Sequence, residues 1–561
     1  MLSTLPDRAR ATAAAVLPDA GTPAGTVVLR FADLRVQGQG TVSAAGSVPL
    51  TGEMTVFCRP VVTAPALVRR DGTVLADAWL PDMVRLGELE RHLGDGVIEA
   101  IVDAELGKRR LRPRQRRRLM SYPLVIRLMI AMTLMPDACY GEALSRLAGL
   151  VADVPFALDW HIPTGKVVTE WRLLIPASVM EEIFWQAAGP LIGDDDPSAF
   201  LLAGMPVGAA DGMLVNLPDT PANRRFFGST GTADDSSPFP QVRIVAVTAR
   251  AGRAMLGAIL GQAGTGEQAL LKRLAERRPE LFDGRVTCFD RNFPGHALVT
   301  AILDAGGHVV ARASATLSLP MAPGGGWLGD GSRLSWLNAP SGKKADRLPV
   351  RVTEHNALFP AAEGEEQVSE TCTIITTLLD HEAAPAEAVR EAYLTRWSAS
   401  ETTFGEDKTT ITGAGNRTSG PVLRSGCPRL VISEAWAWLT ATQLTRAAEA
   451  AALAGEHAAA RALRRKGAAP VTPGEESFTA ARHHMIRSMA ASQVTASSSL
   501  DALAAAAGAS ARATLHTLNV PGRERHSDRE QKARPKFPHT AATKTTVTGK
   551  PQVTVFAPGF C

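Results

Sequence analysis

The chain has 561 residues, with 60 Lys and Arg against 56 Asp and Glu, and a formal net charge of only +4. With 45% hydrophobic and 21% charged residues, its composition is that of a globular protein and excludes a disordered or fibrous chain. The length predicts two to four folded units, because one domain usually holds about 100–200 residues. The small positive balance alone neither indicates nor excludes an anionic partner.

Cysteine usage and hydropathy predict a cytoplasmic protein with no membrane association. The six cysteines are scattered and form no CxxC pair, which argues against a disulfide framework or a zinc site. No basic start followed by an apolar stretch marks a signal peptide. The longest apolar run, Leu128–Met135, is far shorter than the ~20 residues that cross a bilayer.

The first part of the chain divides into two predicted segments. Residues 1–79 alternate weakly and contain many Gly, Pro and Thr, which predicts strands and loops of unclear role. Residues 80–165 follow with apolar side chains three or four positions apart, which predicts a helical domain. Within it, residues 108–118 hold eight cations and no acid. This run is either a solvated loop or a surface that binds phosphate.

The rest of the chain predicts a mixed α/β sheet with an insertion. Strand and helix signals alternate over residues 166–316, the first part of a core. Residues 317–370 hold several Gly and Pro and predict a β-rich insertion, and residues 371–465 return to the core and end in Ala-rich helix. Residues 466–561 are polar and basic, which predicts a flexible tail.

Three acids have a context that is typical of functional sites. Asp211 lies at or near a strand in GAADGMLVNLPDTPANR, and Asp290 ends the apolar strand RVTCFD. Acids at the carboxyl ends of sheet strands lie where α/β folds place ligands. Each acid taken alone is more often a turn former or a helix cap. Glu401 lies on a predicted helix, where a solvated acid is ordinary.

Together these residues resemble the IS4-type family of DDE transposases, the bacterial insertion-sequence enzymes with a ribonuclease-H-like core. DGMLVNLPDTPAN is similar to the family's Asp-Gly-Thr…Pro-Asp…Asn block, with Asp211 as its leading acid. CFDRNFPG resembles the family's Asp-Arg-Gly-Phe, with Asn292 in place of Gly. The resemblance covers roughly residues 80–450.

The third motif, YLTRWSASETTFGEDK, resembles the family signature Tyr-x2-Arg-x3-Glu-x6-Lys. Tyr393, Arg396, Glu401 and Lys408 match it, but four residues rather than three separate Arg396 from Glu401. On a straight helix, one extra residue rotates Glu401 by ~100° relative to Arg396. A local bulge would absorb this rotation.

The resemblance implies a mixed-sheet α/β fold, namely a ribonuclease-H-like catalytic core with a β-rich insertion and an N-terminal helical domain. It implies that Asp211, Asp290 and Glu401 are both the catalytic residues and the ligands of two Mg²⁺ ions, with Mn²⁺ as a substitute. Carboxylate oxygens suit a hard cation, and two such ions serve both ends of an in-line phosphoryl displacement. The implied activity is that of a DDE-type metal-dependent transposase, which hydrolyses DNA at element ends and joins the 3′-OH to target DNA.

The implied partner is double-stranded DNA, both transposon ends and target, bound by a homodimer in a synaptic complex and located at the bacterial nucleoid. Tyr393, Arg396 and Lys408 would contact the backbone near the scissile bond. Trp397, Trp327 and Trp336 are candidates for stacking an unpaired base, although core packing is the more common role of a tryptophan. The helical domain would recognise the ends through its basic run, with contacts from Arg114, Arg116, Arg117 and Arg118.

Other chemistry finds little support. GQAGTGEQ (261–268) has the glycines of a phosphate-binding loop, but it has Glu and Gln where Lys and Ser or Thr belong, and no strand is predicted before it, so it predicts a turn and a helix start. No GxSxG or HExxH motif occurs. Two other functions stay open: a non-catalytic DNA-binding relative of a transposase, and a nuclease that hydrolyses DNA without joining it.

Overall fold

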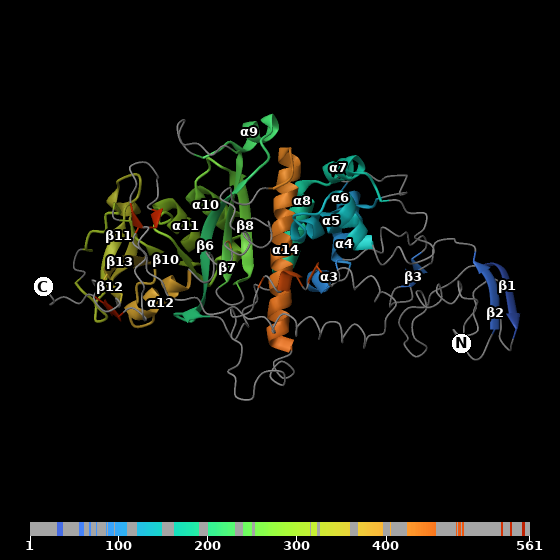
Figure 1. Cartoon of the computed structure of the whole chain (residues 1–561). Coiled ribbons are helices and arrows are strands. Elements are labelled where there is room, and N and C mark those ends of the chain that lie inside the picture. The colour runs from blue at the N-terminus through green and yellow to red at the C-terminus, as the bar shows by residue number, and fades with distance from the viewer. Residues whose placement is uncertain are drawn as a thin grey trace, which may run out of the picture. The chain divides into compact units, whose positions relative to one another are not determined.

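The computed structural model divides into two compact units, which are described separately (Figure 1). The structure describes residues 31–37, 55–60, 67–68, 74–75, 86, 88–94, 96–108, 120–148, 162–189, 200–230, 239–249, 253–314, 316–322, 326–359, 368–396, 404, 423–455, 478, 481–483, 485–486, 529–530, 539–540 and 552–555. These two units are fewer than the six segments expected from the sequence, and the limits of those segments stay predictions.

The first unit is largely helical. Its strands pair two by two, as β1 (Phe31–Gln37) with β2 (Thr55–Pro60) and β3 (Leu67–Val68) with β4 (Val74–Leu75). Its helices are α3 (Glu88–Leu93), α4 (Val97–Gly107), α5 (Tyr122–Leu134), α6 (Tyr140–Ala148), α7 (Gly165–Leu174), α8 (Ala177–Ala188) and the long α14 (Pro428–Gly455) (Figure 1). Among the described residues, no helix is long and apolar enough to cross a membrane.

A buried cation joins three helices of this unit. The side chain of Arg127 on α5 is fully buried, and its Nε donates to both carboxylate oxygens of Glu90 on α3, at 3.0 and 3.1 Å. Its Nη2 donates to Glu99 on α4 at 2.6 Å. A buried charge is tolerated only when it is paired in this way, so Arg127 fixes how α3, α4 and α5 pack.

The carboxyl end of α5 is held by arginines from distant parts of the chain. Arg424 donates to the carbonyl oxygens of Met135 and Ala138, each at 2.7 Å, and Arg482 donates to that of Leu134 at 2.6 Å. The last carbonyls of a helix have no partner within it and carry partial negative charge. The two arginines therefore cap α5 and connect it to segments that follow the core in sequence.

The second unit is a mixed sheet flanked by helices (Figure 1). Its core strands are β5 (Leu201–Leu202), β6 (Met205–Asn216), β7 (Gln241–Ala249), β8 (Met255–Gln262), β9 (Val286–Phe289) and β10 (His308–Arg312). The other described strands are β11 (Arg333–Leu337), β12 (Leu348–Phe359), β13 (Val368–Thr376), β14 (Arg529–Glu530), β15 (His539–Thr540) and β16 (Gln552–Val555). Its helices are α9 (Pro221–Phe227), α10 (Glu267–Arg277), α11 (His296–Asp304) and α12 (Ala386–Arg396), with short 3-10 turns at Pro279–Leu281 and Lys344–Asp346.

The strand order is β11-β12-β13-β10-β9-β6-β7-β8. β6, β7 and β8 form an antiparallel meander, whereas β9 and β10 lie on the other side of β6 and run parallel to it. This is the ribonuclease-H-like arrangement, and the predicted mixed-sheet α/β fold with an N-terminal helical domain is confirmed. β6 is the central strand of this core, so its side chains have neighbours on both sides.

Helices cover both faces of this core. α10 and α11 pack together on one face, where the backbone of Gly212 on β6 lies against Glu267 of α10. α12 covers the opposite face and contacts β6, β9 and β10. The residues of β6 therefore point alternately toward α10 and toward α12.

The insertion extends the same sheet. β13 pairs antiparallel with β10, β12 pairs with β13, and β11 pairs with β12. Strand β16, from the segment expected to be a tail, pairs with β12. The β-rich insertion thus continues the core sheet beyond β10, and α12 begins soon after β13 ends.

One local expectation is wrong: a strand does precede the glycine-rich stretch 261–268. β8 runs directly into it, and a turn leads to α10 at Glu267. Strand β8, MLGAILGQ, has two glycines and a single β-branched residue, so its sequence carries little strand signal. The turn and helix start are confirmed.

The glycine after Asp211 has a packing reason that can be tested. A Cβ at Gly212 would lie 2.6 Å from the side-chain atoms of Glu267, which is held by an ion pair with Arg243. We expect Gly212→Ala to lower the free energy of unfolding by about 1–3 kcal/mol, because overpacking forces such neighbours to move. Urea denaturation measures this change.

Gly264→Ala is the matched control, because nothing lies within 4 Å of a Cβ there and its φ is not positive. Equal stability of the two alanine variants would contradict the close packing of α10 on β6.

Candidate active site

Two of the predicted acids lie side by side because of strand register. β6 and β9 are parallel neighbours, and their last register pair is Ala209 with Cys288. Two residues further along come Asp211, still on β6, and Asp290, the residue directly after β9 ends at Phe289. Side chains alternate between faces with a period of two, so both acids lie on the face that is covered by α12. A register shift of one residue would send one of them to the opposite face.

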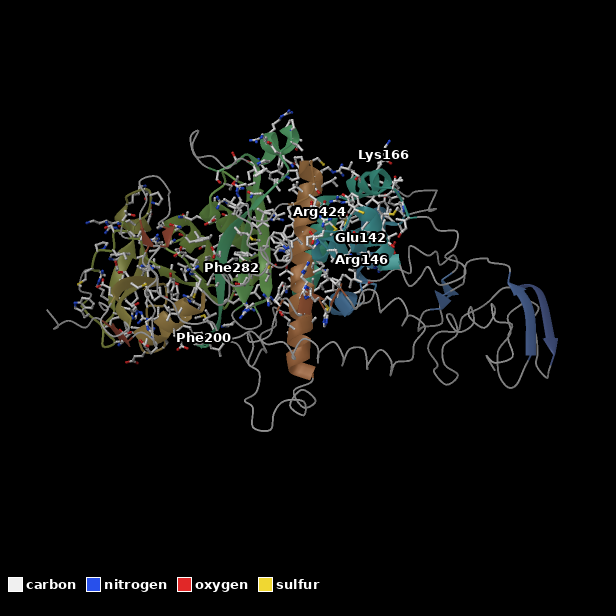
Figure 2. All side chains as sticks on the ribbon, in the orientation of Figure 1. Glu142, Arg146, Lys166, Phe200, Phe282 and Arg424 are labelled. Carbon is white, nitrogen blue, oxygen red and sulfur yellow. The ribbon has the colours of Figure 1, made fainter. Side chains whose placement is uncertain are left out.

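An apolar cluster fixes α12 over this face. Val207 on β6 and Cys288 on β9 pack with Val389, Ala392 and Tyr393 of α12. The Cys288 thiol is fully buried and donates to the carbonyl oxygen of Ala392 at 3.4 Å. Phe200, labelled in Figure 2, packs against the same cluster from the chain that precedes β5. The last turn of α12 therefore lies next to the ends of the core strands.

Arg396 at the end of α12 meets the first acid. Its Nη1 lies 3.6 Å from Oδ2 of Asp211, and the two side chains are 3% and 20% exposed. The other oxygen of Asp211, Oδ1, accepts a hydrogen bond from the backbone N–H of Gly212 at 2.8 Å. Asp211 is therefore a partly buried carboxylate beside an opposite charge.

Tyr393 lies beside the second acid. Burial raises the pKa of Tyr393 to about 12, the nearby Arg396 charge lowers it, and the negative charge of Asp290 raises it. Its ring faces the Arg396 guanidinium, whose carbon lies 5.9 Å from the ring centre. Asp290 itself accepts a hydrogen bond from the backbone N–H of Arg291 at 2.7 Å. With so high a pKa, the Tyr393 hydroxyl keeps its proton at neutral pH.

The structure thus brings together four of the predicted site residues: Asp211, Asp290, Tyr393 and Arg396. Two neighbouring carboxylates repel each other unless positive charge lies nearby, and Arg396 supplies one such charge. Carboxylate oxygens from adjacent strands are also the donors that a hard divalent cation prefers, so the pair fits such an ion.

The other predicted site residues lie outside the described residues: Glu401, Trp397, Lys408, Arg114, Arg116, Arg117 and Arg118. Within the described part of the chain, no three His, Cys, Asp or Glu side chains gather closely enough to hold a metal. Trp327 is 38% exposed, and Trp336 on β11 is half-buried. Their roles, and the third carboxylate, stay predictions.

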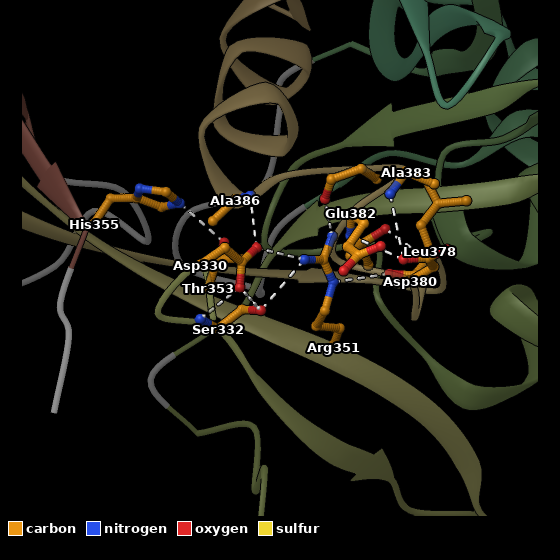
Figure 3. Close-up of polar contacts among 12 residues, drawn as sticks. Asp330, Ser332, Arg351, Thr353, His355, Leu378, Asp380, Glu382, Ala383 and Ala386 are labelled. Carbon is orange, nitrogen blue, oxygen red and sulfur yellow. Dashed lines mark hydrogen bonds and ion pairs between the residues drawn. The ribbon is translucent and has the colours of Figure 1, made fainter. Parts of the chain in front are cut away.

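The sequence reading missed a polar network at the other end of α12, centred on Asp330 and Arg351 (Figure 3). Asp330 lies in a glycine-rich turn and Arg351 in an ordinary strand. Neither residue belongs to a recognisable motif. The one weak signal in the sequence is that Arg351 lies between two apolar residues, Val350 and Val352. This pattern does not indicate which residue pairs with Arg351.

The Arg396–Asp211 contact predicts a stability effect. We expect Arg396→Met to lower the free energy of unfolding at pH 7 by about 1–3 kcal/mol, because a partly buried carboxylate loses its counter-charge. Arg390→Met is the control on the same helix, since Arg390 pairs with the exposed Glu387 one turn away. Chemical denaturation that gives equal values for the two variants would show that the Asp211 contact contributes nothing.

Comparison with known proteins gives one curated relative. Over 249 residues, the chain is 26% identical to Transposase InsG for insertion sequence element IS4 of Escherichia coli (strain K12), which covers 43% of this chain and 52% of the relative. The chain therefore spans about half the length of that protein. No protein-family model matches.

A solved structure, the cryo-EM structure of a piggyBac transposase synaptic complex with hairpin DNA, aligns over 78% of this chain and 86% of that one. Its identity is 10% and its TM-score is 0.38, which is too distant to support an argument. The similarity to InsG stands by itself, and it confirms the resemblance to IS4-type transposases that the three sequence motifs predict.

Proposed function

We propose that this chain is a DNA transposase of an insertion sequence, which cleaves DNA at the element ends and joins the freed 3′-OH to target DNA. The observation that carries this proposal is that Asp211 on β6 and Asp290, directly after the parallel neighbour β9, lie beneath the helix that carries Tyr393 and Arg396. The similarity to InsG supports the same class of activity.

Asp211 and Asp290 would hold the divalent metal ions, with Glu401 as the third ligand. Such ions, Mg²⁺ by preference or Mn²⁺, activate the attacking oxygen and stabilise the leaving oxygen of a phosphodiester. The two strands would hold the backbone of both aspartates in place, and the Gly212 N–H donates to one oxygen of Asp211 and orients it. The same residues serve both steps, because strand joining repeats the displacement with a 3′-OH in place of water.

Arg396 and Tyr393 would contact the DNA strand at the scissile phosphate. Arg396 is a permanent cation next to the acids, and guanidinium groups bind phosphate oxygens with two parallel hydrogen bonds. Tyr393 stays protonated, because burial holds its pKa near 12, so its hydroxyl can donate a hydrogen bond but does not act as a base at neutral pH. Lys408 would bind a neighbouring phosphate.

Recognition of the element ends would fall to the basic run 108–118, including Arg114, Arg116, Arg117 and Arg118. Cations at this density bind the DNA backbone and release counterions, which makes the affinity fall as salt rises. A homodimer would hold two ends in one synaptic complex. The proposed partner is therefore double-stranded DNA, first at the ends and then at the target.

Replacement of each acid tests the proposal. We expect Asp211→Asn and Asp290→Asn to lower strand cleavage by more than about 100-fold, since even residues that only support metal ligands cost 10- to 100-fold. Asp304→Asn, at the exposed end of α11, should cleave normally. The assay follows nicking, in Mg²⁺, of a plasmid that carries the DNA flanking this coding region.

The products separate the rival functions. Joined strands support a transposase, cleavage without joining indicates a hydrolytic nuclease, and binding without cleavage by the unaltered protein indicates a non-catalytic relative. Near-normal cleavage by either aspartate variant would remove that residue from the active site.

A further inference from the structure

A buried arginine in the insertion contacts the segment that leads into α12 (Figure 3). The side chain of Arg351 on β12 is fully buried. Its Nε donates to the carbonyl oxygen of Leu378 at 2.9 Å, and its Nη2 donates to that of Ala384. Its Nη1 donates to Asp330 at 2.8 Å and to the hydroxyl of Ser332 at 3.3 Å. One side chain thus holds both ends of the connection between β13 and α12.

Asp330 holds the first residue of α12 directly. Its Oδ2 accepts from the backbone N–H of Ala386 at 2.9 Å as well as from Arg351. Its Oδ1 accepts from the backbone N–H of Ser332 at 3.0 Å and from the Ser332 hydroxyl. The first N–H groups of a helix lack partners within it and attract negative charge. Asp330 therefore caps α12 from 56 residues away in sequence.

The connection is also braced from within. Asp380 accepts from the backbone N–H groups of Glu382 at 2.9 Å and Ala383 at 3.3 Å. The backbone N–H of Ala384 donates to the Asp380 carbonyl oxygen at 3.2 Å. The segment between β13 and α12 is thus fixed by its own turn and by Arg351. A change at Arg351 reaches α12 through this short, tied connection.

The far end of the same helix carries Tyr393 and Arg396. Arg396 is ten residues from Ala386, a distance of about 15 Å along a helix that rises 1.5 Å per residue. A helix of three turns moves as one body over this length, so a shift or rotation at Ala386 moves the Arg396 side chain relative to Asp211.

We propose that Arg351 and Asp330 are positioning residues of the transposase reaction: they fix the start of α12, and thereby place Tyr393 and Arg396 against Asp211 and Asp290. This inference rests on the proposed function. A buried ion pair adds little net stability over apolar residues of similar size, because both charges lose water. Arg351 and Asp330 instead supply hydrogen bonds, which are directional and therefore fix where α12 begins.

The test uses a thiol beneath α12 as a reporter of its position. Cys288 is fully buried and donates to Ala392, so it reacts only when α12 lifts. In Arg351→Met we expect iodoacetamide to alkylate Cys288 roughly tenfold faster, read by mass spectrometry against the exposed Cys139. Cleavage should fall by about 10- to 100-fold, since misplacement by 1 Å costs this much, while DNA binding stays within about twofold.

Arg333→Met is the matched control. Arg333 lies on β11 of the same insertion, donates to the carbonyl oxygen of Leu319 at 3.0 Å and pairs with Glu354 at 3.5 Å, so these two contacts stay within the insertion. It should leave Cys288 alkylation and cleavage unchanged. Arg351→Lys keeps the charge but loses the planar set of donors, so it should restore stability more than it restores cleavage.

Asp330→Asn serves as a second variant if Arg351→Met does not fold, because it keeps the size of the side chain but removes the charge and turns one of the two acceptor oxygens into a donor. The proposal is overturned if the folded variants alkylate Cys288 and cleave like Arg333→Met, or if alkylation of the half-buried Cys427, in the helical unit, rises by the same factor together with a general loss of stability. If the unaltered protein cleaves no DNA, the proposed function fails, whereas Cys288 alkylation still decides whether Arg351 positions α12.

Discussion

The arrangement of the candidate active site depends on the parallel register between β6 and β9. Ala209 is paired with Cys288, so Asp211 and Asp290 are carried to the same edge and the same face of the sheet. Two carboxylates so placed repel each other, which costs stability. The stability of the surrounding core must hold them there, and a local cost of this kind is typical of sites that bind a cation.

Helix α12 packs over these two carboxylates and brings a positive charge to them. Its apolar residues bury Cys288 and Val207, and its last turn brings Arg396 to Asp211. The start of the same helix is tied to the insertion through Asp330. One short helix therefore joins the insertion to the candidate active site, so the insertion can influence the position of Arg396 without approaching the acids. A second contact, from His296 of α11 to the carbonyl oxygen of Asp346, ties the insertion to the helix that follows Asp290.

The core could be predicted from the sequence only where local residue patterns indicate a strand, a helix or a motif. The β6 and β9 strands have apolar runs, α12 is rich in the helix formers Ala, Glu and Arg, and the acids follow motifs, so the resemblance singled out Asp211, Asp290, Tyr393 and Arg396 as candidates. β8 was not predicted because its glycines have low strand propensity, and the strand is stabilised by its neighbours in the sheet. Helix α9 was missed although Thr220 and Pro221 form a recognisable start, with the Thr220 hydroxyl accepting from the Asn223 N–H.

Contacts between residues that are far apart in the sequence could not be predicted, because the local sequence around each residue does not indicate them. The Asp330–Ala386 hydrogen bond spans 56 residues, and the Arg351–Leu378 bond spans 27. Nothing near Asp330 indicates a helix cap, because the helix it caps is not the one that follows it. Such a contact follows from the pairing of β12 with β13, which depends on the whole sheet.

The near-neutral net charge of the chain differs from the local distribution of charge at this site. Net charge acts over a surface and is screened within about 10 Å at 0.1 M salt, so +4 on 561 residues would steer the proposed DNA partner weakly. At the site, Arg396 is only 3% exposed and already lies beside Asp211. A guanidinium that is held out of water gives up little hydration when a phosphate oxygen takes a place next to it. In the proposed reaction, attraction of the scissile phosphate would depend on the buried Arg396 beside Asp211, and its position would matter more than the net charge of the chain.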